Sequence, residues 1–336
     1  MPTLTLHNEE LIPMNKFKVI VTRKWPAEVE AELAALYDVQ LNENDQPFSA
    51  EQLKIALQTA DAVLPTVTDA LTADVLNVAN KRAKIIGNFG VGFNNIDIQT
   101  AKAQGLVVTN TPHVLTDCTA DIAMLLLLMS ARRASEGDRL VRNQQWTGWR
   151  PTHLLGQKVT GKTLGLIGFG RIAQAMAKKA HHGFGMRILF YAPSQPSQDI
   201  MDDLQATRCT SVEDLLSAVD FVSLHCPGGE VTRHLINEAR LKLMRPTAHL
   251  INTARGDVVD SKALLKALRE GWIAGAGLDV YEGEPNINPE FLTLDNVTLL
   301  PHLGSATTET RIAMGHRVLA NIAAFFAGVE PQDRVA

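Results

Sequence analysis

Three polar residues in the second half of the chain are of types that can bind an acid and move a proton. Each follows an apolar stretch of the kind that forms a buried strand: Arg255 after 248–252, Glu284 after 274–280 and His302 after 297–300. An arginine can bind a carboxylate through two hydrogen bonds, and a histidine is the usual proton donor to a carbonyl near neutral pH. A carboxylate beside the histidine would fix its tautomer. Any one of the three could be an ordinary surface or loop residue, but together they predict an acid–base site.

A glycine-rich turn precedes these residues in the chain. Gly168, Gly170 and Ala173 form the pattern G-x-G-x-x-A between a short apolar run and an alanine-rich helical stretch. Gly168 would permit the tight turn, Gly170 would let the backbone approach a pyrophosphate, and Ala173 would let the helix pack on the strand. Free N–H groups at Arg171 and Ile172 would bind the phosphate oxygens. A glycine turn without a ligand is the alternative, but the flanking strand and helix favour a dinucleotide site.

Strand and helix patterns alternate along most of the chain. The first hundred-odd residues already show this alternation, which predicts an open parallel sheet. A long helical region begins at Asp117, and the alternation resumes at the glycine turn. We therefore expect an α/β fold of two open parallel-sheet, Rossmann-like domains, with the cofactor domain inserted into the substrate domain. The expected substrate-binding, flavodoxin-like domain comprises 1–110 and 303–336, and the expected dinucleotide-binding Rossmann domain comprises 111–302. Ligands of such sheets bind beyond the carboxyl ends of the strands, where the three polar residues lie.

Composition narrows the class of protein and its compartment. The 336 residues are 46% hydrophobic and 20% charged, which is ordinary for a globular protein. A net charge of −4 without a basic stripe argues against a nucleic-acid partner. The longest apolar run, 122–129, is too short to span a bilayer, so no membrane partner is expected. Three cysteines without metal-type spacing, and no export signal, indicate reduced thiols in a cytoplasm and no metal site.

Four motifs resemble, in order and spacing, those of the D-isomer-specific 2-hydroxyacid dehydrogenases. They are Gly-Phe-Gly-Arg-Ile-Ala at 168–173, Asn-Thr-Ala-Arg-Gly at 252–256, Asp-Val-Tyr with Glu-Pro within 279–285, and Pro-His-Leu-Gly-Ser-Ala-Thr at 301–307. The resemblance covers nearly the whole chain after about residue 17. Within the family the chain is most similar to the glyoxylate/hydroxypyruvate reductases, on the stretches 91–97, 108–112 and 304–307.

The resemblance implies an NAD(P)H-dependent reduction of glyoxylate or hydroxypyruvate to the D-2-hydroxy acid by hydride transfer. It implies that Arg255 binds the substrate, that His302 is the proton donor and that Glu284 pairs with His302. The backbone amides of Val91 and Gly92 would hold the substrate carboxylate. It also implies a homodimer through the cofactor domain, with 117–149 as the contributing segment. The implied cofactor residues are Gly168, Gly170, Arg171, Ile172, Ala192, Ser194, Cys226, Pro227, Thr253, Asp279 and Gly304.

One departure from the usual pattern bears on the cofactor. NAD-binding units carry an acid about 20 residues beyond the glycines, which binds the ribose 2′-hydroxyl. The corresponding stretch here, 191–195, reads Tyr-Ala-Pro-Ser-Gln, so no acid repels a 2′-phosphate, and no arginine within it clamps one. Ser194 and Gln195 could donate hydrogen bonds. We therefore expect NADP as the preferred cofactor and NAD as the alternative.

Other readings of the same fold stay open to different degrees. Formate dehydrogenases place a glutamine where Glu284 stands, and phosphite dehydrogenases carry a lysine in the loop occupied by 90–92, so both are disfavoured. A dehydrogenase for a larger 2-keto acid remains an alternative, because side chains of the first domain would shape that pocket. A dinucleotide-sensing corepressor shares the arginine, glutamate and histidine, but such proteins usually add a long disordered tail, which is not expected after Ala336.

Overall fold

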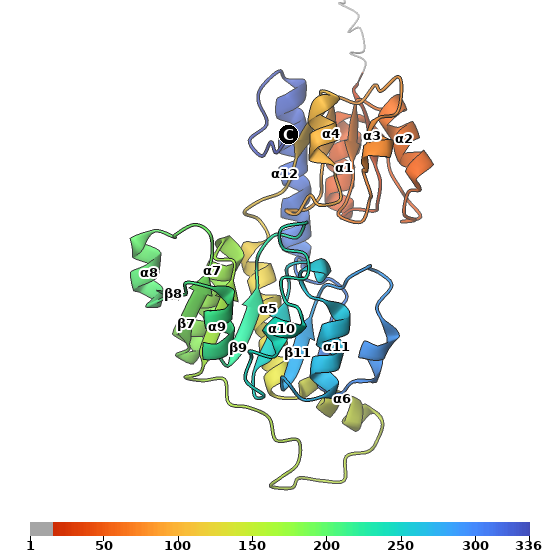
Figure 1. Ribbon diagram of the computed structural model, residues 1–336. Coiled ribbons are helices and arrows are strands. Elements are labelled where there is room, and N and C mark those ends of the chain that lie inside the picture. Colours follow the sequence, from red (N-terminus) through yellow and green to blue (C-terminus); the bar gives the residue numbers. More distant parts are fainter. Residues whose placement is uncertain (1–15) are drawn as a thin grey trace, which may run out of the picture. The chain divides into compact units, whose positions relative to one another are not determined.

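The computed structural model describes residues 16–336, which belong to two compact units (Figure 1). The first unit contains the chain up to Thr111 and, after an interruption, Ile312–Ala336; the second unit is Pro112–Arg311. The expected α/β fold with two parallel-sheet domains is confirmed. The return to the first unit lies after Arg311, later than the expected position after residue 302. The reason is that the segment following residue 302 is hydrogen-bonded to Asp279 of the second unit.

The first unit is built on a five-stranded parallel sheet with the order β2-β1-β3-β4-β5, which is the flavodoxin-like order. Its strands are β1 (Lys18–Val21), β2 (Asp38–Gln40), β3 (Ala62–Leu64), β4 (Ile85–Gly87) and β5 (Val107–Thr109). Its helices are α1 (Ala27–Leu36), α2 (Ala50–Thr59), α3 (Ala73–Leu76), α4 (Ile98–Ala103) and the larger part of α12 (Thr308–Phe326). Ser49 and Gln52 form the capping box that starts α2.

The second unit contains a seven-stranded parallel sheet with the order β12-β11-β10-β9-β6-β7-β8. Its strands are β6 (Thr163–Ile167), β7 (Arg187–Tyr191), β8 (Thr207–Arg208), β9 (Phe221–Leu224), β10 (His249–Asn252), β11 (Gly275–Leu278) and β12 (Val297–Leu299). Its helices are α5 (Thr116–Ala131), α6 (Ala134–Arg142), α7 (Arg171–Phe184), α8 (Gln198–Leu204), α9 (Val212–Ala218), α10 (Glu238–Leu241), α11 (Ser261–Arg269) and the 3₁₀ turns Gly256–Val258 and Pro289–Thr293. Six of the strands, β6 to β11, follow the Rossmann order. The strands after β6 are added on one side as far as β8 and then, from β9 on, on the other side.

The core of the second unit lies on both faces of this sheet. Every residue of β6 is buried, as expected for a central strand of a parallel sheet. The apolar run of α5 packs against α7, β10 and β11, with Ala123, Leu126 and Leu127 fully buried. Among the residues that the structure describes, no helix is both long enough and apolar enough to cross a membrane.

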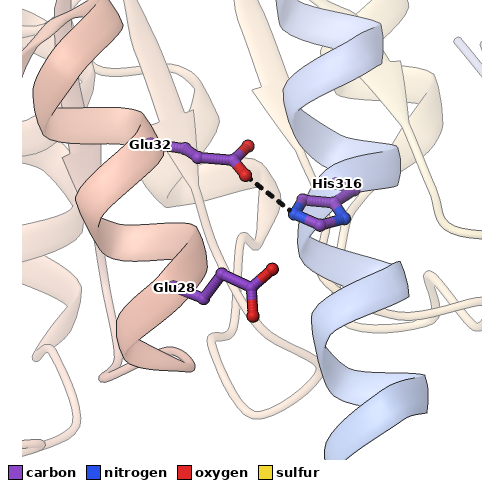
Figure 2. Close-up of side chains that lie close together, drawn as sticks. All are labelled: Glu28, Glu32 and His316. Carbon is purple, nitrogen blue, oxygen red and sulfur yellow. Dashed lines mark hydrogen bonds and ion pairs between the residues drawn. The ribbon is translucent and has the colours of Figure 1, made fainter.

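Two helices of the first unit approach each other closely at a glycine. A Cβ atom on Gly315 of α12 would lie 2.6 Å from Cγ1 of Val29 on α1. On the rim of this contact, Nε2 of His316 lies 3.1 Å from Oε1 of Glu32, and Glu28 lies one turn away on α1 (Figure 2). The absence of a side chain at Gly315 therefore sets the spacing of α1 and α12.

We predict that alanine has opposite effects at two helical glycines. Gly183→Ala in α7 places its Cβ in open space, so better helix propensity is expected to raise the free energy of unfolding by about 0.5–1 kcal/mol. Gly315→Ala is expected to lower it by about 1 kcal/mol, because overpacking against Val29 exceeds the gain in propensity. Calorimetry of each variant would measure both effects, and a stabilised Gly315→Ala protein would refute the close contact.

Candidate active site

The carboxyl ends of five neighbouring strands meet at one edge of the second unit's sheet. Leu224 of β9 pairs with Ile167 of β6 on one side and with Asn252 of β10 on the other. Leu278 of β11 continues the row, because it pairs with Asn252 and with Leu299 of β12. Residues expected at the site follow these positions: Gly168, Cys226, Thr253, Asp279 and His302. Residues that are far apart in the sequence thus share one edge.

His302 and Glu284 form a hydrogen-bonded pair. Nδ1 of His302 lies 2.8 Å from Oε2 of Glu284, and the side chains are 37% and 30% exposed. Burial opposes ionisation of Glu284, but hydrogen bonds from His302 and from the N–H of Tyr281 outweigh it, so the pKa of the Glu284 carboxyl is lowered. A carboxylate at Nδ1 leaves Nε2 as the ring nitrogen that can exchange a proton with a ligand.

Asp279 holds the backbone that carries His302. The Asp279 carboxylate is buried and accepts hydrogen bonds from the N–H groups of Leu303 (2.7 Å) and Gly304 (2.8 Å), while its carbonyl accepts from the N–H of His302 (2.9 Å). His302 has a left-handed backbone, with φ of 56°, which a residue other than glycine adopts at some cost. Burial raises the pKa of Asp279 in spite of the two N–H donors. Asp279 therefore fixes the position of the imidazole.

Arg255 lies beside the loop that carries Glu284. A Cβ on the next residue, Gly256, would lie 1.9 Å from the carbonyl carbon of Tyr281, so only glycine lets these two loops touch. Burial lowers the pKa of the Arg255 guanidinium, while the charges of Glu284 and Asp257 oppose that effect. A mostly buried guanidinium of this kind is stabilised by an anionic partner, and a carboxylate ligand would supply one.

The glycine turn has a closed side and an open side. Gly168 has φ of +86°, its N–H donates to the carbonyl of Tyr191 (2.9 Å), and a Cβ on it would lie 2.7 Å from the backbone N of Cys226. Gly170 precedes α7, and a Cβ on it would meet no atom within 4 Å. The first N–H groups of α7, at Arg171 and Ile172, therefore face a turn with room for a phosphate.

The neighbouring strand ends carry buried groups that are neutral near pH 7. Burial raises the pKa of the Cys226 thiol to about 11 and lowers the pKa of His225 to about 4. Pro227 follows Cys226 at the end of β9. The Thr253 hydroxyl is buried and has no hydrogen-bond partner among residues 16–336, so a ligand could satisfy it. Near pH 7, therefore, neither the Cys226 thiol nor the His225 imidazole is charged.

The end of β7 carries an arginine that the sequence analysis did not expect. Ala192 is buried, Ser194 is exposed, and Nη2 of Arg208 donates to the carbonyls of Ala192 (2.8 Å) and Pro193 (3.1 Å). The stretch 191–195 contains no arginine, as expected, but Arg208 reaches it from the adjacent strand β8. β8 has only two residues, so it has no periodicity by which the sequence could reveal it.

In the first unit, the loop after β4 leaves two backbone amides without a partner. The carbonyl of Gly92 accepts from Nδ2 of Asn88 (2.9 Å), and the carbonyl of Val91 accepts from Nδ2 of Asn110 (2.8 Å). Within residues 16–336, no hydrogen bond is made by the N–H of Val91 or of Gly92. The loop is thus fixed through its carbonyls, while these amides can bind an anion.

A cluster in the first unit could in principle ligate a metal. Glu28, Glu32 and His316 offer ligand atoms within 4.8 Å of one another (Figure 2). The two glutamates are exposed, and His316 already pairs with Glu32. We assign this cluster to helix packing and not to the chemistry of the strand ends.

The chain matches a family model and many characterised proteins. Residues 124–304 match the model described as D-isomer specific 2-hydroxyacid dehydrogenase, NAD binding domain. Similar relatives include glyoxylate reductases of Thermococcus onnurineus, 46% identical over 95% of this chain and 96% of that one, and of Pyrococcus furiosus, 45% identical over 95% of each. A D-isomer specific 2-hydroxyacid dehydrogenase from Polaromonas has a similar structure, with a TM-score of 0.89 and 36% identity over 96% of this chain and 100% of that one. An NADPH-dependent glyoxylate/hydroxypyruvate reductase from Sinorhizobium meliloti, in complex with NADP and malonate, also has a similar structure. Its TM-score is 0.85, with 33% identity over 96% of this chain and 97% of that one.

We predict that the two glycines of the turn respond differently to alanine. Gly168→Ala is expected to lower the free energy of unfolding by about 2 kcal/mol or more, because of the positive φ and the clash with the backbone at Cys226. Gly170→Ala is expected to change it by less than about 0.5 kcal/mol, because its Cβ meets open space. Denaturant unfolding would measure both values, and equal costs would contradict the described turn.

Proposed function

We propose that this chain, which belongs to the D-isomer-specific 2-hydroxyacid dehydrogenase family and is therefore an enzyme, reduces glyoxylate or hydroxypyruvate with NADPH in preference to NADH. The observation that carries the proposal is the His302–Glu284 pair, which lies beside Arg255 at the carboxyl edge of a Rossmann-ordered sheet. The activities for which these relatives are named support the substrate class. In this proposal the second unit binds the cofactor and the first unit binds the substrate.

Each proposed role follows from the chemistry of one group. Arg255 binds the substrate carboxylate and carbonyl. The free N–H groups of Val91 and Gly92 are the anion-binding groups that the first unit offers. Bound NADPH supplies the hydride to the keto carbon. The carbonyl oxygen gains negative charge and takes the proton from Nε2 of His302, which gives the 2-hydroxy acid in its D form where the carbon is chiral. Glu284 stabilises the protonated imidazole before the transfer.

The features of the cofactor site support a dinucleotide. The room at Gly170 and the N–H groups of Arg171 and Ile172 fit a pyrophosphate, and the partnerless hydroxyl of Thr253 fits a polar group of the bound cofactor. In the proposal, Cys226, Pro227, Asp279 and Gly304 line the same cleft, and Ala192 and Ser194 lie at the adenosine ribose. Ala192 supplies no carboxylate to bind a 2′-hydroxyl or repel a 2′-phosphate, which favours NADPH.

An extended segment of the second unit supports a homodimer. The chain between α6 and β6 runs away from the body of this unit (Figure 1). This segment exposes three large apolar side chains: Trp146 (56%), Trp149 (82%) and Leu155 (66%). Val141, near the end of α6, is also exposed (58%). Exposed tryptophans in one segment are typical of a protein interface. We infer that this segment, together with the region from Asp117, contacts a second copy of the chain.

The cysteines support a reducing compartment. Cys118, Cys209 and Cys226 are all unpaired and partly buried. Thiols that stay free are typical of cytoplasmic proteins. We propose the cytoplasm as the site of action.

We predict distinct kinetic effects for the three catalytic residues. His302→Gln is expected to lower kcat/KM for glyoxylate by ~10²–10⁴-fold. Glu284→Gln keeps the shape and is expected to cost about 10- to 100-fold, because the amide replaces the carboxylate that accepts from Nδ1 of His302. Arg255→Gln is expected mainly to weaken binding of the keto acid.

A neighbouring pair in the same unit provides the control. Nε2 of His234 lies 3.0 Å from Oε1 of Glu282, so His234→Gln removes a similar pair that includes none of these three residues. It is expected to retain activity within about threefold. All four variants are expected to bind NADPH with nearly unchanged affinity, measured by fluorescence titration. Equal losses of kcat/KM in His234→Gln and His302→Gln would contradict the assignment of His302 as the proton donor.

We predict that the double variant Trp146→Ala, Trp149→Ala is monomeric. Buried interface tryptophans often contribute 2 kcal/mol or more each, so losing two is expected to dissociate a dimer at about micromolar concentration. Light scattering after size exclusion would give the mass. Leu292→Ser, which changes another exposed apolar residue of this unit (66% exposed), is the control and is expected to stay dimeric. A wild-type monomer would refute the proposal.

A further inference from the structure

We propose that Arg208 binds the 2′-phosphate of NADPH and thereby sets the coenzyme preference. The inference rests on the proposed function, since it requires that the second unit bind a nicotinamide dinucleotide. The stretch 191–195 contains no residue that could bind a 2′-phosphate through a positive charge, and Arg208 would provide that charge. The ligand group is a phosphate monoester on the adenosine ribose.

The position of the ribose follows from the glycine turn. The N–H of Gly168 donates to the carbonyl of Tyr191 (2.9 Å), which joins the turn to the last residue of β7. A dinucleotide whose pyrophosphate lies at the N-terminus of α7 extends its adenosine ribose past the end of β7. The residues just beyond that end are Ala192 and Pro193, whose carbonyls accept from Nη2 of Arg208 at 2.8 and 3.1 Å.

β8 brings Arg208 to this place. Arg208 pairs with Phe190 in the parallel sheet, and Phe190 is the residue before the last of β7. The side chain is long enough to reach forward along the strand direction to the carbonyls of 192 and 193. β7 and β8 are neighbours in the sheet (Figure 1). The guanidinium thus lies at the end of β7, the strand whose end carries the acid in an NAD-binding unit.

The charge of Arg208 is not neutralised by the protein. Its partners are two neutral carbonyls, and no carboxylate of residues 16–336 forms an ion pair with it. The two carbonyl bonds use donors on Nη2, which leaves the donors on Nε and Nη1 for a ligand. The residue is exposed, so a phosphate can reach it from solvent. An arginine with free donors is well suited to a doubly charged phosphate.

Two neighbours agree with a phosphate at this position. Ala192 presents only a methyl group, so nothing there competes for the guanidinium or repels the ligand. Ser194 is exposed and can add a hydroxyl donor. The competing explanation is that Arg208 only secures the turn after β7 through its two carbonyl bonds. That role would affect NADPH and NADH equally.

The test is Arg208→Gln, with binding measured apart from catalysis. Calorimetric titration with 2′,5′-ADP and with ADP, which lacks the 2′-phosphate, gives the affinity for the phosphate itself. Arg208→Gln is expected to weaken 2′,5′-ADP by about 10- to 100-fold and to change ADP far less. The ratio of kcat/KM values for NADPH and NADH is expected to fall by a similar factor, and the effect is expected to shrink at high salt.

Two further variants make the outcome decisive. Arg187→Gln removes the same charge at the opposite end of β7, and it is expected to leave both ligands unaffected. Arg208→Lys keeps the charge without the planar fork and is expected to restore only part of the affinity. Equal weakening of 2′,5′-ADP and ADP in Arg208→Gln, or no weakening, would overturn the inference. If 2′,5′-ADP selectivity follows Arg208 but no keto acid is reduced, the proposed function fails and the inference stands.

Discussion

The buried carboxylate of Asp279 is the fixed point on which the candidate site depends. Removing a carboxylate from water is costly, and here two backbone N–H groups of the loop after β12 offset part of that cost. The same bonds hold His302 in a left-handed conformation with its imidazole toward Glu284. Glu284 is itself held by the N–H of Tyr281. The geometry of the acid–base pair is thus determined by main-chain contacts and not by the pair alone.

Burial separates the titratable groups of the strand ends into active and inactive ones. The protein surroundings of the His225 and Cys226 side chains keep both neutral near pH 7. His302 and Glu284 are about one-third exposed and bonded to each other. A single edge of one sheet therefore contains several groups of suitable chemical type, and among these four His302 and Glu284 are the two that are hydrogen-bonded to each other.

The sequence predicted most of what is local. The strand, turn and helix around Gly168, and the strands that precede Arg255 and His302, each have a pattern that lies within a dozen residues. It did not predict Arg208, whose position depends on pairing between two strands far apart in the chain. Nor did it predict Gly256, whose requirement arises only from contact with Tyr281. The bounds of the two units also depend on contacts that leave no local pattern, such as the hydrogen bond between Asp279 and Leu303. The roles of the site residues stay predictions.

The interruption of the first unit has a consequence for the order in which the chain folds during synthesis. The sheet of this unit is complete by Thr109, yet α12 supplies Val318 and Ile322, which pack next to Gly87 of β4. The backbone N–H of Val335 donates to the carbonyl of Val108 on the edge strand β5. These partners leave the ribosome after the whole of the second unit. The contiguous second unit can therefore complete its core first, which reverses the usual N-terminal-first order of folding. Until α12 is made, one face of the first unit's sheet stays uncovered. That exposed apolar face is a surface to which a chaperone can bind.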